Sequence, residues 1–513
     1  MACRHCGLSE NSLTKDDINS LPASGEDLWA FVQRTDAEIT RVEDLLKGLI
    51  LKRAFLKKKI NHHSSPLLKI PPEVTSEIFK AYIRQEEEDV DLDQGPVYLS
   101  QLRHDASQAP LLLSAVCTAW RELAWSMPWV WSSVNLMLGA SGPTSVALLD
   151  EWLSRSRHCP LTIRLKYVFS VAEEGYDTIL GIMSVVARFS ERWRHIIFNL
   201  PILCYDALRS VRGRLPMLKS LSLRLLGEER GSAMNALQMF SIAPQLHVAQ
   251  CEDFPPQGVV LPLDQLTSLS AYQCGSSMHC VETLDAGSQL RHASFVLDYR
   301  SAWVITPSAP HQVLAPHLHS LKFLVNKRGF TCTILDHLAL PNLRELSFTG
   351  LSGREPFTMS SLVSLISRSA CPLQSLSITS LYLDGELFRC MQVMPSLSEL
   401  TISTLGNIAR EIIRNLNPTT LNPPLLPNLR KLSISESGMT IDLIELHSML
   451  CARWEWTGGS GAGSGQKVTR LQSIVVVGFS TKEDTHEQGI RLLRQLVAEG
   501  MNISIKSNYE IWL

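Results

Sequence analysis

The sequence predicts an α/β chain that begins with a helix and a small helical module and continues as a long solenoid of strand–helix repeats. Three observations predict this fold class. Residues 28–60 carry apolar side chains at heptad spacing, residues 67–83 and 111–125 carry them at helical spacing, and a Pro-x-Leu-x-x-Leu phrase recurs after residue 214. At 513 residues the chain exceeds one ordinary core, so several domains or an elongated array are expected.

Composition and charge limit the function classes. Hydrophobic residues make up 45% of the chain and charged residues 19%, which is enough to bury a large interior. The formal charge of -2 gives no broad attraction for nucleic acid or an anionic membrane, and no apolar stretch predicts a membrane span. The twelve cysteines lack paired spacing and the start MACRHCGLSE lacks a signal-peptide core, so a cytoplasmic or nuclear protein with reduced thiols is expected.

Residues 1–27 form a polar segment without a clear period, and residues 28–65 are expected to form a heptad-bearing helix. Apolar side chains recur at its first and fourth heptad positions. The first positions hold Ile39, Leu46, Arg53 and Ile60, and the fourth hold Val42, Leu49, Leu56 and His63. This short coiled-coil-like seam leaves two alternatives: the helix self-associates, or it packs on the rest of the chain.

Residues 66–135 are expected to form a small helical domain with an acidic insertion at 84–110. Pro71 and Pro72 suit the first positions of a helix, and Glu73 suits its positive N-terminus. An apolar stripe follows, formed by Val74, Ile78, Phe79 and Tyr82. A second helix over 111–125 places four side chains on one face, namely Leu112, Val116, Trp120 and Leu123. Ordinary amphipathic helices inside a larger fold would show the same pattern.

These two helices resemble an F-box-like domain of the kind abundant in mushroom-forming fungi. The matching pieces, in order, are Ile70-Pro71-Pro72-Glu73, Ile78-Phe79, VCTAWRELA at 116–124, and Pro128-Trp129-Val130-Trp131. Ile70 stands where the family usually has Leu, and the insertion separates the two halves. The resemblance implies binding to the Skp-type adaptor of a cullin-RING ubiquitin ligase. The residues that would contact this adaptor or support the contact are Ile70, Pro71, Pro72, Glu73, Ile78, Phe79, Val116, Cys117, Trp120 and Leu123.

A repeat organises residues 136–513. The clearest copies are LPMLKSLSL at 215–223, LPNLRELSF at 340–348 and LPNLRKLSI at 426–434. Steps between copies are mostly 20 to 32 residues, the period of leucine-rich repeats. The first Leu of successive copies is Leu218, Leu246, Leu266, Leu290, Leu318, Leu343, Leu373, Leu397, Leu429 and Leu471. Helical stretches at 361–370, 443–454 and 489–500 lie between copies, so we expect a right-handed α/β solenoid with strands inside the curve and helices outside.

Signatures of catalysis and cofactor binding are weak. The chain has no H-E-x-x-H and no G-x-S-x-G motif, and GGSGAGSG at 458–465 lacks the Gly-Lys pair of a phosphate-binding loop, so it predicts a flexible insertion. Cys3, His5 and Cys6 form one metal-like cluster, but no fourth ligand is placed to complete it. A second such cluster is Cys274, His279 and Cys280. We therefore expect a protein that is not an enzyme and holds no cofactor.

Two functions remain open. The favoured one is a substrate-recruiting adaptor subunit of a ubiquitin ligase, whose F-box-like helices bind the Skp-type adaptor while the solenoid binds an unknown protein target. The alternative is a stand-alone interaction scaffold in which the helical module caps the solenoid, since terminal repeats need covering. Neither function includes a nucleic-acid or membrane partner.

Overall fold

The computed structural model describes residues 25–84, 109–138, 146–167, 176–227, 236–297, 312–325, 332–350, 356–383, 386–404, 408–420, 423–454, 468–481 and 486–507. Most of the polar segment 1–27, most of the acidic insertion, the glycine-rich stretch 458–465 and the cluster at Cys3 lie outside these residues. The described residues separate into two compact units. A helical unit comprises residues 25–84 and 109–126, and a solenoid unit begins at Met127.

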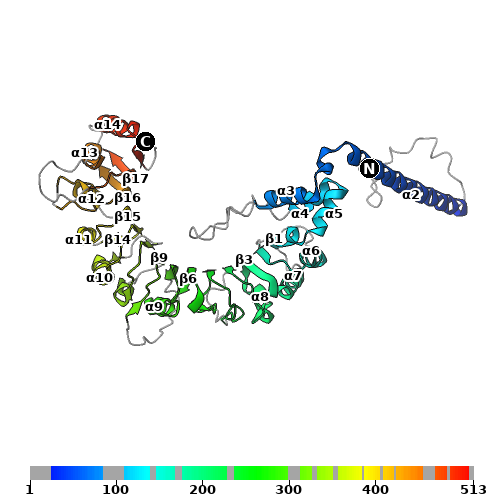
Figure 1. Cartoon of the computed structure of the whole chain (residues 1–513), viewed down its shortest axis with the longest axis horizontal. Helices are drawn as coiled ribbons and strands as arrows, with labels where there is room; N and C mark the ends of the chain where they lie inside the picture. The colour runs from blue at the N-terminus through cyan, green and yellow to red at the C-terminus, as the bar shows by residue number, and fades with distance from the viewer. Residues whose placement is uncertain are drawn as a thin grey trace. The chain divides into compact units, whose positions relative to one another are not determined.

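The helical unit begins with a single long helix. Helix α2 spans Gly25–Ser64 and covers the region that the heptads predict, and the 3-10 turn η2 (Pro66–Lys69) follows it. The three shorter helices are α3 (Pro72–Arg84), α4 (Ala109–Val116) and α5 (Thr118–Ser126) (Figure 1). Pro72 is the first residue of α3, where its missing N–H costs nothing and its fixed φ suits the helix.

The prediction of one continuous helix over 111–125 is wrong, because two helices meet at Cys117. The Cys117 sulfur accepts the backbone N–H of Trp120 at 3.5 Å, and the Cys117 carbonyl accepts the N–H of Arg121 at 3.0 Å. Cys117 therefore stands at the cap position of α5 and starts a new helix. The predicted common face is divided accordingly. Leu112 and Val116 on α4 are exposed, whereas the α5 side chains Trp120 and Leu123 are half-buried.

The solenoid unit is built on one parallel sheet of fourteen strands whose spatial order follows the chain. This confirms the predicted fold class, an α/β chain whose leucine-rich repeats stack as a solenoid. The first half of the sheet contains β1 (Ser133–Leu138), β2 (Leu161–Tyr167), β3 (Trp193–Pro201), β4 (Ser220–Leu226), β5 (Val248–Glu252), β6 (Ser268–Cys274) and β7 (His292–Leu297). The second half contains β9 (Ser320–Val325), β11 (Glu345–Gly350), β13 (Ser375–Thr379), β15 (Glu399–Thr404), β16 (Lys431–Ile441), β17 (Ser473–Thr481) and β18 (Asn502–Ser507).

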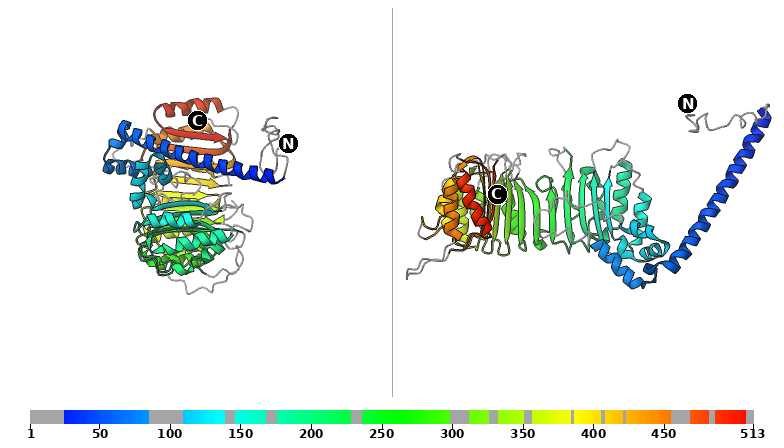
Figure 2. Two further views of the ribbon diagram at one scale, coloured as in Figure 1. Left: turned by 90° about the vertical axis from the view of Figure 1, so that its right-hand side faces the viewer. Right: turned by 90° about the horizontal axis from the view of Figure 1, so that it is seen from above.

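The helices that connect these strands lie on one face of the sheet, and none of these connecting helices lies on the other face (Figures 1 and 2). They are α6 (Val146–Arg155), α7 (Tyr176–Arg188), α8 (Ile202–Asp206), α9 (Ser277–Ala286), α10 (Met359–Ser369), α11 (Leu387–Gln392), α12 (Ala409–Leu416), α13 (Leu443–Trp454) and α14 (His486–Ala498). Some repeats have a shorter element in place of the helix. Between β5 and β6, the 3-10 turn η9 (Leu263–Gln265) stands in place of a helix. Other repeats contain pairs of two-residue strands: β8 (Val313–Leu314) with β10 (Leu338–Ala339), and β12 (Pro356–Phe357) with β14 (Tyr382–Leu383).

A continuous interior links the repeats. All ten predicted leucines are at most 2% exposed. Alternate strand side chains point into the same interior, and Phe323 lies 6.0 Å from Phe295 and 5.3 Å from Phe348 between ring centroids. Each repeat therefore completes the core of its neighbours, which is how a solenoid stabilises units that could not fold alone. No helix in the described part of the chain is long and apolar enough to cross a bilayer.

The solenoid unit provides its own N-terminal cover. The 3-10 turn η5 (Pro128–Trp131) directly precedes β1 and buries Trp131. The Trp131 ring meets Trp152 of α6 edge-on at 4.8 Å, and the Arg155 guanidinium lies over it at 5.0 Å from the ring centroid. The Pro-x-x-Trp segment of the F-box-like resemblance thus belongs to the solenoid unit in this structure.

Candidate protein-binding surfaces

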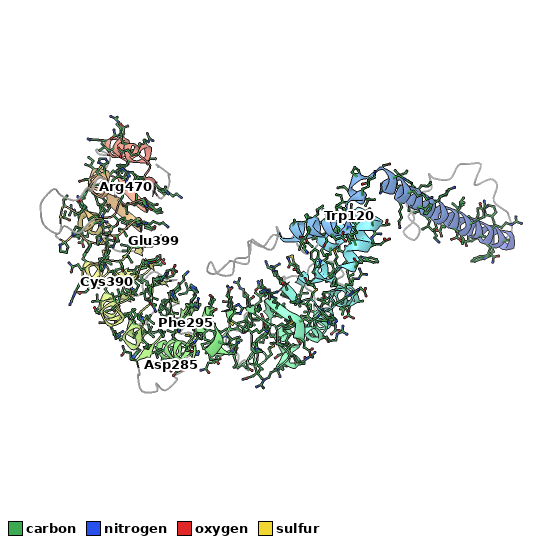
Figure 3. The ribbon with its side chains drawn as sticks, in the orientation of Figure 1. Trp120, Asp285, Phe295, Cys390, Glu399 and Arg470 are labelled. Atoms are coloured by element: carbon green, nitrogen blue, oxygen red, sulfur yellow. The ribbon has the colours of Figure 1, made fainter. Side chains whose placement is uncertain are left out.

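The sequence-predicted site residues of the helical unit divide into an inner and an outer group. Phe79 is fully buried and meets the Trp120 ring edge-on at 5.1 Å with an interplanar angle of 68°. This ring pair (Trp120 is labelled in Figure 3) forms the interior of the unit together with buried residues of α4 and α5 such as Leu113 and Ala124. The residues Ile70, Cys117, Trp120 and Leu123 are half-buried, whereas Pro71, Pro72, Glu73, Ile78 and Val116 are exposed.

The structure splits the predicted apolar stripe of α3. Phe79 and Thr75 face the interior, and the Thr75 hydroxyl donates to the Pro71 carbonyl at 3.3 Å. The other apolar side chains remain in solvent. We call these the exposed apolar set: Val74, Ile78 and Tyr82 on α3, and Leu111, Leu112 and Val116 on α4. Each is at least 40% exposed, so a partner that covered them would gain about 25 cal/mol per Å² of apolar surface.

A cavity of about 430 Å³ lies between the end of α2, η2 and the start of α5. Apolar side chains contribute to its lining, including Phe55, Leu68 and Val116, and cationic ones stand at its rim, including Lys58 and Arg121. The Arg121 guanidinium donates to the Ser114 carbonyl at 2.8 Å, which fixes its position across the α4–α5 junction. The cavity shares Val116 with the exposed apolar set, so one partner could engage both.

The open face of the sheet presents the strand side chains that alternate with the buried ones. From β7 to β16, the register aligns a row of mostly small hydroxyl side chains along this face: Ser294, Lys322, Ser347, Ser377, Thr401 and Ser433. Each member is partly exposed, and Lys322 is its one charged residue. An adjacent pair is joined across two strands, where the Thr379 hydroxyl donates to the Thr349 hydroxyl at 3.0 Å. Short side chains keep this part of the face flat and accessible to a protein surface.

A basic row follows the N-terminal ends of consecutive strands. We define it as Arg194, Lys219, His247, Arg291, His319 and Arg344. Backbone hydrogen bonds of 2.8–3.1 Å connect these positions in order, with Thr267 between His247 and Arg291. Because neighbouring strands lie about 4.8 Å apart, the row forms a regular series of positive or protonatable groups. Within the described part of the chain, its Lys and Arg members form no ion pair, so their charges are not neutralised.

His195, the residue after Arg194, responds to this row. Its ring nitrogen Nδ1 lies 2.9 Å from the Ser220 hydroxyl. Burial, followed by the nearby positive charges, lowers the pKa of His195 from 6.5 to about 4; the contributing groups are Arg194, His247, Lys219 and Arg164. The cations themselves give this edge of the sheet a positive potential, which would attract an anionic partner.

The cluster Cys274, His279 and Cys280 lies at the end of β6 and the start of α9. The Ser276 hydroxyl accepts the N–H of His279 at 3.1 Å and caps this helix. Burial, followed by a hydrogen bond with Cys274, raises the pKa of Cys280 well above 9, so its thiol stays protonated. Burial also lowers the pKa of His279. The described residues contain no group of three side chains arranged to hold a metal ion.

The basic row was missed by the sequence analysis, although its signal was present. In the repeat phrase, the residue that follows the first Leu is Lys219, His247, Arg291, His319 and Arg344 in five of the copies. The spacing of the leucines defines the fold and is the strongest signal in the repeat. The side chain after each leucine becomes significant only when the register places successive copies side by side.

No protein-family model matches this sequence, and the comparison with curated proteins finds no match. Among solved structures, the chain is similar to the crystal structure of an internalin from Listeria monocytogenes. The two chains are 12% identical, the match covers 75% of this chain and 89% of that chain, and the TM-score is 0.30. So distant a likeness adds nothing to the argument. The assignment of a leucine-rich α/β solenoid therefore rests on this chain's own sheet register and buried leucines.

Proposed function

We propose that the chain is a protein-interaction scaffold without catalytic activity, in which the open face of the solenoid binds a protein target. The observation that supports this proposal is the sheet itself. Fourteen parallel strands are covered by their connecting helices on one face only, which leaves a long open surface on the other, with a row of mostly hydroxyl side chains from β7 to β16. A rigid surface lowers the ordering cost of binding, which favours recognition of a large partner.

The basic row indicates the charge of the bound target. Its unpaired cations stand beside the open face, so a target with a row of carboxylates would gain attraction and orientation there. The side chains of the row are spread over several repeats, and the row contains no Phe, Tyr or Trp, the large rings on which nucleic-acid bases stack most readily. An acidic protein segment is therefore the partner that this surface suits.

A poly-glutamate peptide provides a direct test of the basic row. Fluorescence anisotropy of a labelled peptide should show binding by the full chain that weakens with salt, and Arg291→Glu with Arg344→Glu should weaken it by about tenfold. Arg491→Glu with Arg494→Glu, on the exposed surface of α14, is the charge-matched control and should leave the affinity unchanged. Equal loss in both variants would show only a general charge effect and would contradict recognition by the row.

A second candidate function is suggested by the exposed apolar set. We infer that the helical unit recruits a Skp-type adaptor of a cullin-RING ligase, with Ile78 and Val116 in the contact and Phe79 and Trp120 supporting it from inside. The support for this role is the F-box-like sequence resemblance together with apolar side chains that stay in solvent on two neighbouring helices. The solenoid would then present its target to the ligase.

Binding of a purified Skp-type adaptor tests this second function. Ile78→Asp and Val116→Asp should abolish binding while the chain remains folded, because both side chains are exposed. Trp120→Ala removes an interior ring contact, so its effect should be matched by lost thermal stability of the helical unit. Lys80→Asp, on the same helix, is the control and should bind as the unmodified chain does. Absence of adaptor binding by the unmodified chain would leave the scaffold function standing alone.

A further inference from the structure

Helix α2 is an unusually long element without a covering partner in the described chain. It spans 40 residues, and every described side chain from Trp29 to Asn61 is exposed. Near its C-terminal end it contacts the rest of the helical unit, for example through the ion pair between Lys58 and Glu122 at 3.6 Å. Within the helical unit, α2 therefore leaves most of its length uncovered.

The exposed side chains of α2 include a mostly apolar heptad seam. The frame that the sequence suggests extends one turn further, with Val32 at position a. The exposed apolar members of positions a and d are Val32, Ile39, Val42, Leu46, Leu49, Leu56 and Ile60. Isolated helices are only marginally stable in water, and amphipathic helices owe most of their stability to packing of the apolar face. A helix of this length with this seam is suited to a partner helix.

The charges that flank the seam change sign along the helix. In this frame the flanking e and g positions hold Asp36, Glu38 and Glu43 in the N-terminal half, and Lys52, Lys57 and Lys59 in the C-terminal half. All six side chains are exposed. Glu38 also forms an exposed ion pair with Arg41 at 2.9 Å on the same helix, a contact weak enough to be shared or exchanged. The acidic side chains that flank the seam in the N-terminal half of α2 are thus complementary in charge to the basic ones in its C-terminal half.

We propose that two copies of the chain associate through α2 as an antiparallel coiled coil. In a parallel pair, residues at g contact those at e of the following heptad in the second helix. That alignment would place Glu38 against Glu43 and Lys52 against Lys57, and it would bring Arg53 against Arg53 in the seam. An antiparallel pair reverses one helix, so the acidic half of each copy meets the basic half of the other.

One antiparallel register satisfies both seam and charges. Placing Leu46 against Leu49 of the second copy also aligns Ile39 with Leu56. The same register pairs Asp36 with Lys57 and Glu38 with Lys59, and the twofold symmetry repeats each pair. A shift by one heptad in either direction brings Lys52 against Lys52 or Glu43 against Glu43. The charge pattern therefore selects orientation and register together, as e and g charges do in coiled coils.

The remainder of the helical unit leaves this seam accessible. Among the α2 residues that line the cavity with α5, Ala54, Phe55, Lys58 and Asn61 occupy heptad positions b, c and f, away from the seam. Lys57 and Lys59 also border the cavity but are exposed residues; the Lys59 ammonium lies over the Phe55 ring at 5.2 Å from the centroid and would have to turn toward a second helix. Of the d positions, His63 at the very end of α2 borders the cavity, whereas Leu49 and Leu56 do not.

The mass of the full chain in solution tests the association. Light scattering after size exclusion should give twice the chain mass of 57.2 kDa, and Leu46→Asp with Leu49→Asp should return it to one chain. Leu51→Asp is the matched control: Leu51 lies on the same helix at position f, 70% exposed, and its replacement should leave the dimer intact. A single-chain mass up to roughly 100 µM would overturn the proposal, since even a micromolar dimer would be nearly complete there.

A charge-exchange experiment tests the orientation. One variant carries Asp36→Lys and Glu38→Lys, and the other carries Lys57→Glu and Lys59→Glu. In the antiparallel pair each variant alone repels its own copy and is monomeric, whereas an equimolar mixture forms a heterodimer with every flanking pair attractive. In a parallel pair each variant would relieve a repulsion and dimerise alone more tightly than the unmodified chain. The second result would contradict the antiparallel arrangement, and dimers that ignore all four changes would exclude α2 as the interface.

Discussion

Arg453 of α13 has no exposed surface, yet the described residues contain no carboxylate paired with it. Its guanidinium donates instead to three backbone carbonyls: that of Leu416 at the end of α12 at 2.7 Å, and those of Leu426, at 3.1 Å, and Leu425 in the segment that leads to β16. Burial lowers the pKa of Arg453 to about 10, so it remains charged at neutral pH. A planar group with five donors is suited to hold an irregular loop whose carbonyls would otherwise lack partners.

Replacing Arg453 by Met should therefore destabilise the C-terminal repeats by about 3–5 kcal/mol, because three buried carbonyls lose their donors together. Hydrogen exchange of α12 and β16 should accelerate in this variant. Arg389→Met is the matched control, since Arg389 on α11 is exposed and pairs only with Glu386 at 3.3 Å in this structure. Unchanged exchange in both variants would mean that the loop holds its shape without the guanidinium.

His195 should make the solenoid unit sensitive to acid. Its pKa is about 4 in the folded chain against 6.5 for the ordinary side chain, so between these values the unfolded chain binds the proton and the folded chain does not. The contribution of His195 to the free energy of unfolding is therefore fully present above about pH 6.5 and is lost as the pH falls toward 4. Because the side chain is partly exposed, we expect a loss of roughly 1–2 kcal/mol. The denaturant midpoint of unfolding should fall less between pH 7 and pH 5 in His195→Gln than in the unmodified chain. The same fall in both proteins would refute this role of His195.

At the scale of elements, a close contact joins the last two helices. Gly489 of α14 packs directly on Leu443, the first residue of α13, and an added Cβ would stand 2.3 Å from the Leu443 Cβ. The α13–α14 pair can approach this closely only because one partner has no side chain. Gly48 of α2 is the opposite case, with nothing within 4 Å of an added Cβ.

Alanine at these two glycines should accordingly have opposite effects. Gly489→Ala should cost about 1–3 kcal/mol through overpacking, which exceeds the gain in helix propensity of at most about 1 kcal/mol. Gly48→Ala should instead raise the helicity of α2 and stabilise it by about 0.5–1 kcal/mol. Thermal unfolding followed by circular dichroism measures both. A neutral Gly489→Ala would show that α14 can move away from α13 without loss.

Elements with a strong apolar period were predictable from the sequence, and those that depend on a single local contact were not. The leucine spacing predicted strands such as β4 and β11, because each of these strands must bury its leucines whichever strand lies next to it. The break between α4 and α5 depends on one sulfur that accepts one N–H, which no period reveals. Phe79 is buried and Ile78 is exposed because the interior is filled by Trp120, whose ring packs on Phe79, and this packing is not visible in the period. The basic row likewise required the strand register.

At the scale of the whole molecule, the chain divides into the helical unit and the solenoid unit. The Phe79–Trp120 ring pair lies within the first unit. The first strand of the second unit is covered by its own Trp131, Trp152 and Arg155. A solenoid needs polar or bulky covers at its ends, and this one begins with its own. The scaffold alternative in which the helical module is needed as a cap is therefore open to a direct experiment.

A chain of residues 127–513 should fold without the helical unit, because the aromatic cover of β1 stays with it. Its far-ultraviolet circular dichroism should retain the helix and strand signal of the solenoid, and its thermal midpoint should match that of the solenoid transition in the full chain. Trp131→Ala in the same chain should lower stability by about 3–5 kcal/mol, since it removes the ring that Trp152 and Arg155 contact. If residues 127–513 aggregate or remain unfolded while the full chain folds, the helical unit is an indispensable cap. Substitutions that test adaptor binding would then also have to be checked for effects on the stability of the solenoid.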